Sequence, residues 1–421
     1  MGAFTGVLGV LVILGLAWLL SVDRRRAVNP RIFIWGLGLP VLLAVVTLRT
    51  PLGARLFITA NDAADAFIGF ADAGINFVFG QWPAVTVVGT PGPGGQGTVP
   101  VTVGFLLAAK VLPIIIFVAS VMAVLYHLGI MQRVVSVLAR LLSRLMHLSG
   151  AEALSTVGDI FLGMTEAPLL IRPYVARMTE SELFAVMTAG MATIAGTVLL
   201  AYKAMGIDAG YLVTASFMNA PLAVLVAKIM IPETGTPETL GKVDVEVPRL
   251  DVNVIDAAAR GAGEGLVLAL NVGAMLIAFV ALVNMLDKGM GLLGGLFGHP
   301  GLRVAEVVGY PLAPLAWVMG VPWSEAPFVG TLLATKTVLN EFLAYQALAA
   351  RMHELAPRTV RIASFALCGF ANFGSLAIVL GGLGKMVPER RADLARLGIK
   401  AVVAGSLATF LSGAIAGVVG G

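Results

Sequence analysis

Long apolar stretches, separated by short polar segments, run along almost the whole chain. Several reach about twenty residues, the length at which a helix crosses the hydrocarbon core of a bilayer. We predict eight spans, near residues 3–22, 31–48, 103–129, 182–206, 210–231, 264–286, 361–386 and 392–418. The alternating ten-residue segments of a membrane barrel do not occur in the sequence. The pattern therefore predicts an all-α polytopic membrane protein.

The remaining segments differ in polarity. Acids interrupt residues 53–80 at Asp62, Asp65 and Asp72, while residues 131–147 carry Arg133, Arg140 and Arg144 on one helical face. Both segments are typical of helices that lie along the membrane interface. The Gly- and Pro-rich residues 81–102 predict a flexible loop, and the polar residues 232–256 predict a cytoplasmic linker.

The composition supports the membrane class. The chain is 58% hydrophobic and 12% charged, whereas soluble proteins carry about 25% charged residues. We expect the Arg24 to Arg26 cluster between the first two spans to be cytoplasmic, which places both termini on the periplasmic side of an inner membrane. The single cysteine, Cys368, has no disulfide partner and no metal-ligand companions, so we expect a packing residue.

Two acids, Glu166 and Glu341, lie in apolar runs that are too short to cross a membrane. A carboxylate at membrane depth is costly, and it usually faces a polar cavity and has a function. The alternative is structural, with each acid paired to a buried base such as Lys110 or Lys336. A short run that enters and leaves by the same face forms a re-entrant hairpin, and we predict one around each acid.

The two acid regions resemble each other. Each has a short run, an acid, a second short run, a basic turn and then a span interrupted by small or polar residues, at 193–196 and at 369–375. Counting spans places the two hairpins on opposite faces, the inverted repeat of many secondary transporters. One observation opposes this topology, because Arg351, Arg358 and Arg361 would face the outside, against the positive-inside bias.

This organisation divides the chain into four parts. We expect N-terminal spans, interfacial helices and scaffold in residues 1–150, and the first hairpin with its broken span in 151–231. A cytoplasmic linker and a scaffold span follow in 232–302. The second hairpin, its broken span and the last span occupy 303–421.

Hairpin tips and interrupted spans leave backbone groups free to bind a polar solute or a cation. The side chains there offer hydroxyl, amide and carboxylate groups, from Thr165, Glu166, Asn340, Glu341, Asn372 and Ser375. No cluster of arginine or lysine accompanies them. The sequence therefore predicts a neutral, hydroxyl-rich substrate without a phosphate.

Five runs carry a family resemblance: Ile114 to Gly129, Gly163 to Tyr174 (GMTEAPLLIRPY), Met178 to Gly196, Asn340 to Tyr345 (NEFLAY) and Ala366 to Leu383 (ALCGFANFGSLAIVLGGL). In sequence and order the chain resembles the bacterial concentrative nucleoside transporters. The resemblance implies eight spans, two oppositely oriented re-entrant hairpins, a homotrimer and an elevator-type movement of a transport domain. It also implies symport of nucleosides, uridine-like or purine, with sodium or a proton, and no cofactor, enzymatic activity or nucleic-acid partner.

The resemblance also assigns roles to residues. Glu341, Asn372 and Ser375 would hold the ribose hydroxyls, with Asn340 beside them. Thr165 and Glu166 would face the nucleobase, and Phe370 would lie near it. Met164 stands where the family commonly has glutamine, which leaves the base preference open.

A candidate cation site follows from the same resemblance. It comprises Asp159, the carbonyls of Leu162 and Ile194, and the hydroxyl of Thr193. Asp159 stands where sodium-coupled members have asparagine, and a carboxylate suits either a sodium ion or a proton. We expect cation binding here to shape the tip that presents Thr165 and Glu166.

Other functions remain as alternatives. Met164 leaves room for a transporter of free nucleobases or modified nucleosides. An intramembrane hydrolase lacks support, because there is no Gly-x-Gly-Asp and the segment from His353 to Pro357 lacks the second histidine of a zinc protease helix. A passive channel is disfavoured by hairpins on both faces, which favour alternating access.

Overall fold

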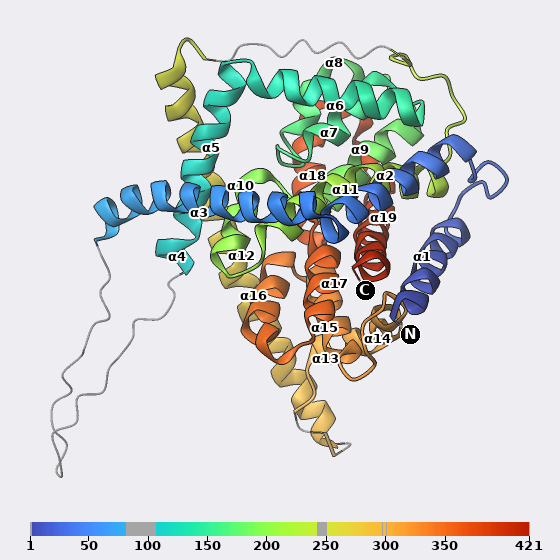
Figure 1. Cartoon of the computed structure of the whole chain (residues 1–421), viewed down its shortest axis with the longest axis vertical. Helices are drawn as coiled ribbons and strands as arrows, with labels where there is room; N and C mark the ends of the chain where they lie inside the picture. The colour runs from blue at the N-terminus through green and yellow to red at the C-terminus, as the bar shows by residue number, and fades with distance from the viewer. Residues whose placement is uncertain (1, 81–106, 242–250, 297, 300, 421) are drawn as a thin grey trace.

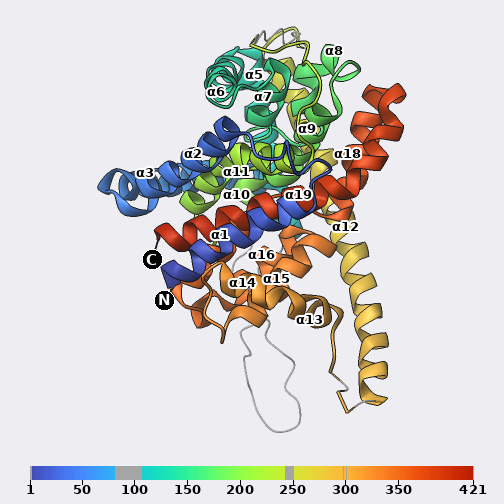
Figure 2. The ribbon, with the colours of Figure 1, turned by 90° about the vertical axis from the view of Figure 1, so that its right-hand side faces the viewer.

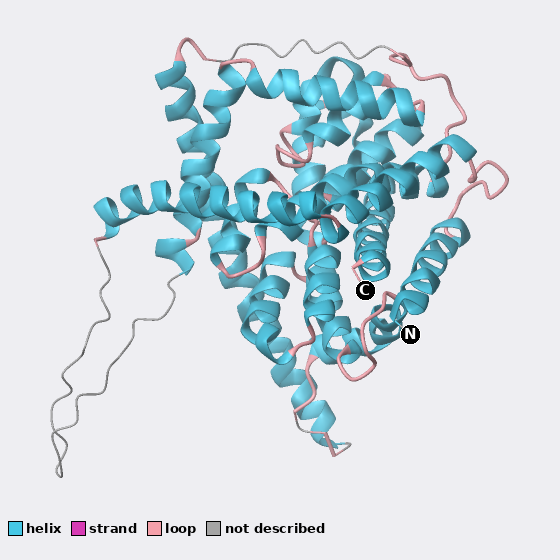
Figure 3. Ribbon diagram, in the orientation of Figure 1, coloured by secondary structure: helices cyan, strands magenta, loops and turns pink. Residues whose placement is uncertain are grey.

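The computed structural model describes residues 2–80, 107–241, 251–296, 298–299 and 301–420, and every regular element within them is a helix (Figures 1 and 3). Four 3₁₀ turns are η1 (Ala167–Ile171), η2 (Tyr310–Leu312), η3 (Met352–Glu354) and η4 (Pro388–Arg390). The α-helices are α1 (Gly2–Leu19), α2 (Pro30–Arg49), α3 (Pro51–Phe79), α4 (Leu107–Lys110), α5 (Leu112–His127), α6 (Ile130–Met146), α7 (Gly150–Gly158), α8 (Arg172–Val175), α9 (Glu180–Ala192), α10 (Gly196–Ala204), α11 (Ala209–Met230), α12 (Val254–Leu296), α13 (Val304–Gly309), α14 (Ala313–Val318), α15 (Ala326–Val338), α16 (Glu341–Arg351), α17 (Pro357–Leu367), α18 (Phe373–Met386) and α19 (Arg391–Val419). The predicted loop at 81–102 and residues 242–250 of the predicted linker lie outside the described residues.

Six helical segments of the described chain are long and apolar enough to cross a membrane: Pro30–Arg49, Ala108–His127, Glu180–Ala204, Ala209–Met230, Val254–Leu296 and Pro388–Val419. They coincide with six of the eight predicted spans. The other two predictions, 3–22 and 361–386, fall on the shorter helices α1, α17 and α18. The architecture is that of a multi-pass α-helical membrane protein.

Two helix–turn–helix units organise the centre. The first hairpin unit, residues 150–175, contains α7, η1 and α8, and the second hairpin unit, residues 326–351, contains α15 and α16. They lie towards opposite ends of the molecule (Figure 1). Each is followed by a broken helix: α9 and α10 after the first, α17 and α18 after the second. The predicted interruptions at 193–196 and 369–375 are therefore confirmed as helix breaks.

Local sequence explains where these helices begin and end. A capping box starts α9, in which Thr179 and Glu182 each accept a hydrogen bond from the other's backbone N–H. Asparagine starts two other helices, since Asn340 Oδ1 accepts from the backbone N–H of Leu343 at 2.9 Å and Asn372 Oδ1 accepts from that of Ser375 at 2.7 Å. Such caps satisfy the free N–H groups of a first helical turn. Both asparagines therefore have a structural role before any ligand is considered.

The two breaks meet each other. The backbone N–H of Phe370, in the second break, donates to the carbonyl of Thr193, in the first, at 3.3 Å. The backbone N–H of Gly196 donates at 3.3 Å to the carbonyl of Phe161 in the first hairpin unit, and Asn219 of α11 donates its amide to the carbonyl of Cys368 at 2.5 Å. Backbone groups freed by the breaks are thus satisfied by neighbouring segments, as membrane-depth backbone requires.

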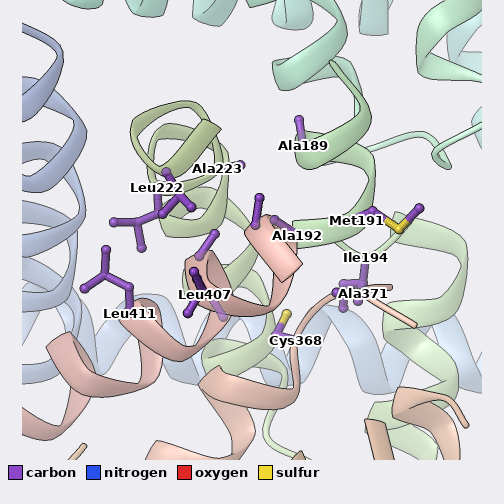
Figure 4. Packing of buried hydrophobic residues seen from close by; sticks show 14 of the residues in the cluster. Ala189, Met191, Ala192, Ile194, Leu222, Ala223, Cys368, Ala371, Leu407 and Leu411 are labelled. Carbon is purple, nitrogen blue, oxygen red and sulfur yellow. The ribbon is translucent and has the colours of Figure 1, made fainter. Parts of the chain in front are cut away.

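The core is formed by α9, α11 and α19 around the second break (Figure 4). Small residues let these helices approach closely, as in other membrane proteins. A Cβ atom on Gly405 of α19 would lie 2.6 Å from Met191 Cβ of α9, so only glycine fits there. Cys368 is fully buried and its Sγ lies 3.7 Å from Ser216 Oγ. Its predicted role in packing is confirmed.

The outer helices are less buried. The 43-residue α12 runs along one edge of the molecule (Figure 2) and is about 65 Å long, more than twice a bilayer core of about 30 Å. Helix α6 is amphipathic as predicted: its three arginines, Arg133, Arg140 and Arg144, are exposed, while Val135 and Ala139 on another face are buried.

The basic turn after the second hairpin unit has a structural explanation. Arg358 donates to the carbonyl of Gly417 at 2.6 Å, and Arg361 donates to the carbonyl of Gly420. Both carbonyls lie at the C-terminal end of α19, where cations compensate the helix dipole. These hydrogen bonds give Arg358 and Arg361 a structural role at the end of α19. The two ends of the described chain lie on the same side of the molecule (Figures 1 and 2), and their predicted periplasmic location stays a prediction.

Candidate functional site

A cavity of about 130 Å³ lies where the two hairpin units and the two breaks converge. Its lining includes all eight side chains that the sequence singled out as substrate ligands: Met164, Thr165, Glu166, Asn340, Glu341, Phe370, Asn372 and Ser375. They come from three separate segments of the chain, at residues 164–166, 340–341 and 370–375. The long helix α12 adds an apolar wall through Leu268, Val272 and Met275. The structure brings the predicted residues together; that they bind a substrate stays a prediction.

Glu341 is the best-supported group of the cavity. It begins α16, is 6% exposed, and accepts a hydrogen bond at each oxygen. Tyr202 Oη donates to Oε1 at 2.8 Å, and Asn372 Nδ2 donates to Oε2 at 3.1 Å. Because Asn372 Oδ1 is occupied by the cap of α18, its amide is fixed with the N–H groups towards Glu341. An ionised carboxylate has about four acceptor sites, so Glu341 can still accept from hydroxyl groups of a ligand.

The tip of the first hairpin unit forms the opposite side. Glu166 is exposed, and its Oε2 accepts from the backbone N–H of Gly163 at 2.8 Å. Thr165 lies against the second broken helix, since a Cβ atom on Gly382 would lie 3.0 Å from its methyl carbon. The tip of one half thus touches the broken helix of the other half. A shift of either would change the shape of the cavity.

The alternative pairing of the acids with buried bases is wrong in this structure. Lys110 forms its ion pair with Asp72, at 2.9 Å. Lys336 donates to the carbonyl of Ala366 and to the hydroxyl of Thr409. Among the described residues, neither Glu166 nor Glu341 forms a salt bridge. Their charge is therefore available to a ligand.

The candidate cation site lies behind the first tip. Asp159 follows α7 directly and is 1% exposed, and both of its carboxylate oxygens lack a hydrogen-bond partner within the described structure. A Cβ atom on Gly190 would lie 3.7 Å from Asp159 Oδ1, so the acid faces α9 just before its break. The break itself supplies Thr193 and Ile194, which are buried, and Leu162 lies in the adjoining turn. A buried carboxylate without a partner is costly, and a bound cation would satisfy it.

The sequence reasoning missed two contributors. Tyr202 of α10 is fully buried and donates to Glu341, and its ring lies 4.6 Å from that of Tyr345. The apolar wall from α12 is the second. The local sequence gives no sign that either contributes to a site. Tyr202 lies in an apolar helical segment, and the wall residues belong to one long apolar run. Only tertiary packing brings them to the cavity.

The arrangement suits a neutral solute with one apolar face and several hydroxyl groups. The described lining combines carboxylate, amide and hydroxyl groups with a phenylalanine ring and aliphatic side chains. No arginine or lysine belongs to the described lining, whereas two carboxylates do. An anion would be repelled.

Comparisons with known proteins agree with this chemistry. Residues 8–82 and 211–417 match models described as the N-terminus and the C-terminus of Na⁺-dependent nucleoside transporters, and residues 108–209 match one described as nucleoside recognition. An uncharacterised transporter, YutK of Bacillus subtilis, is 43% identical over 99% of both chains. The nucleoside permease NupC of Helicobacter pylori is 39% identical over 98% of this chain and 96% of its own.

Solved structures agree as well. CNTnw in an inward-facing, substrate-bound state is 43% identical and superposes with a TM-score of 0.90, covering 100% of this chain and 98% of that one. Variants of CNTnw in outward-facing and intermediate states superpose with TM-scores from 0.88 to 0.91.

Proposed function

This chain belongs to the family of concentrative, Na⁺-dependent nucleoside transporters, and we propose that it is a cation-coupled symporter that imports nucleosides across an inner membrane. It is a transporter and not an enzyme, which removes the hydrolase alternative. The observation that carries the proposal is Glu341, which accepts hydrogen bonds from Tyr202 and Asn372 in a cavity whose described lining contains no basic residue.

In the proposed complex, Glu341 accepts from ribose hydroxyls, and Asn372 and Ser375 complete the ribose site, with Asn340 beside them. The base lies towards Thr165 and Glu166, near Phe370 and against the apolar wall. Met164 offers a thioether in place of an amide, so it contacts the base without reading its polar edge. This assignment follows the polarity of the cavity, in which hydrogen-bonding groups gather around Glu341.

The membrane arrangement we propose has eight spans and two re-entrant hairpins of opposite orientation, assembled as a homotrimer. The two hairpin units with their broken helices, residues 151–231 and 303–421, move as a transport domain. Residues 1–150 and the linker with α12, 232–302, belong mainly to the scaffold. The hydrogen bond between the two breaks, and the one from Asn219 of α11 to the carbonyl of Cys368, support a single moving body. The outward-facing and intermediate states of CNTnw support alternating access.

The coupling cation, Na⁺ or H⁺, would bind at Asp159 with Leu162, Thr193 and Ile194. Coupling requires that ion and nucleoside stabilise the same closed state. The geometry offers a route, because Asp159 and Glu166 lie on the same hairpin unit, seven positions apart. A cation that neutralises Asp159 would fix the turn between them and so the tip that presents Thr165 and Glu166.

Counterflow of radiolabelled uridine in proteoliposomes tests the substrate class. Adenosine, inosine and pseudouridine should compete with uridine, because all carry the ribose hydroxyls that Glu341 would accept. Uracil, which has no ribose, and uridine 5′-phosphate, which two carboxylates repel, should compete at least tenfold less well. Competition by uracil equal to that by uridine would favour the alternative, a transporter of nucleobases.

Replacement of Tyr202 by phenylalanine tests how Glu341 is positioned. The change removes one hydrogen bond to a buried carboxylate, so the KM for uridine should rise about three- to tenfold. Tyr345→Phe is the matched control, because the Tyr345 hydroxyl donates to the carbonyl of Ser364, away from Glu341. The KM of each variant is obtained from initial rates of uridine uptake at increasing uridine concentrations. Equal KM values in the two variants would show that Tyr202 does not orient the acid.

A further inference from the structure

Lys336 is a buried charge to which the proposed mechanism gives no role. It lies in α15, the first helix of the second hairpin unit, five residues before Glu341, and it is 0% exposed. Its ammonium group donates to the carbonyl of Ala366 at 2.9 Å and to Thr409 Oγ1, and it lies 5.4 Å from the centre of the Phe410 ring. Among the described residues no carboxylate forms a salt bridge with it. Each of these three contacts is one that a cation prefers: a carbonyl, a hydroxyl and an aromatic face.

The position of Lys336 corresponds to that of Asp159 in the first half. Asp159 ends the first helix of its hairpin unit and faces α9 at Gly190, two residues before α9 ends. Lys336 lies near the end of the first helix of its own unit and contacts α17 at Ala366, one residue before α17 ends. Each side chain therefore lies between a hairpin helix and the C-terminal end of the helix before the break, but only Lys336 forms a hydrogen bond there.

The C-terminal ends of α9 and α17 both favour a nearby positive charge. The last carbonyls of a helix carry partial negative charge and favour a cation. At the end of α17 this charge is met by Lys336. At the end of α9 the neighbouring charged group is a carboxylate with both oxygens unpartnered, which makes the site more negative. Within the described structure, Asp159 has no basic partner, so the first half has no counterpart of the Lys336 ammonium at this position.

We propose that the Lys336 ammonium is the tethered cation of the second half, doing for the second hairpin unit what the coupling cation does for the first. It ties α15 to α17 and α19 and so positions the tip, Asn340 and Glu341, without an ion from solution. Lys336 is a positioning residue, because it does not line the substrate cavity. The inference rests on the proposed cation site at Asp159, and it makes coupling asymmetric: only the first half senses the ion gradient.

The full-length protein in proteoliposomes provides the test. Lys336→Met keeps the length of the side chain and removes its charge; the KM for uridine should rise about tenfold or more, while the cation concentration for half-maximal uptake changes less than twofold. Lys336→Ala should show the same loss but leave space, so that added methylammonium restores the KM towards the original value. The methionine variant fills the space and should not respond. Lys400→Met, an exposed lysine on α19, is the control.

Three results would overturn the inference. One is a methionine variant with an unaltered melting temperature and an unaltered KM. Another is an alanine variant whose defect is indifferent to methylammonium, since the lysine would then act by packing alone. If neither variant folds, the reversal potential of uridine transport by the unaltered protein provides the third test. The inference predicts that one positive charge moves with each uridine. Two charges per uridine would indicate that a second cation from solution is transported, which the tethered ammonium should make unnecessary. Failure of the unaltered protein to couple uridine uptake to any cation gradient would instead refute the proposed function.

Discussion

Replacing Glu341 with alanine is expected to reduce uridine affinity at least a hundredfold and to abolish measurable uptake. The substitution removes the acceptor for the ribose and leaves the Tyr202 hydroxyl and the Asn372 amide without their present acceptor in a buried place. Each unpaired buried group costs about 1–3 kcal/mol, and each 1.4 kcal/mol is a factor of ten in affinity. Equilibrium binding of uridine to the purified variant, together with uptake in proteoliposomes, measures the loss.

Two companion variants make the Glu341 result specific. Glu341→Gln keeps the volume and one acceptor oxygen but places a second donor against Tyr202 or Asn372, so an intermediate loss of about tenfold is expected. Glu354→Ala removes an exposed acid next to the same hairpin unit, paired with Arg351, and should have no effect. A folded Glu341→Ala protein that binds uridine within twofold of the original would contradict the proposed site.

The second large effect is expected at Asp159. In the Asp159→Ala variant, a cation gradient should no longer stimulate uridine uptake, because the only carboxylate of the candidate cation site is gone. The unaltered protein should gain thermal stability from its coupling cation, since a ligand of the folded state raises the melting temperature. That gain should disappear in the variant. Asp62→Ala, an exposed acid of α3, is the control. Unchanged stimulation by the gradient would rule out this cation site.

The Asp159→Asn variant distinguishes coupling to sodium from coupling to protons. The side chain keeps an oxygen ligand but cannot take up a proton. If sodium is the coupling ion, Asp159→Asn should remain gradient-dependent, as the asparagine of sodium-coupled relatives implies. If the proton is the coupling ion, the same variant should lose its dependence on pH gradients. Uptake with sodium and pH varied separately distinguishes these outcomes.

Much of the fold could be predicted because the local signals are strong. The length of each apolar stretch predicts the membrane spans. The β-branched and small residues at 193–195 indicate the first helix break, and the Asn372 cap indicates the second. The termini of α1 and α12 were harder. The predicted span 264–286 is the middle of a helix of 43 residues, and an apolar pattern alone does not reveal how far a helix continues beyond the bilayer. The predicted span 361–386 is divided into α17 and α18, because the backbone breaks around Gly369 and Asn372 caps the next helix, whereas α1 simply ends at Leu19.

The site was predictable where its residues interrupt an apolar run and not elsewhere. Glu166, Glu341 and Asp159 are conspicuous because carboxylates are rare in such surroundings. Tyr202 is not, since an aromatic residue in an apolar helix usually packs in the core, and its hydrogen bond to Glu341 depends on tertiary structure. From the sequence alone, Lys336 is predicted only as a possible partner of an acid. Its actual partners, a carbonyl and a hydroxyl on two other helices, are invisible in the sequence.

Accumulation of uridine against its own gradient tests the central claim most directly. Proteoliposomes containing the unaltered protein are loaded with a low concentration of uridine, and an inward gradient of Na⁺ or H⁺ is imposed. The proposed symporter should concentrate labelled uridine above the outside level, and an ionophore that collapses the effective gradient should release it. Uridine that only equilibrates across the membrane, whichever gradient is imposed, would contradict cation-coupled nucleoside transport.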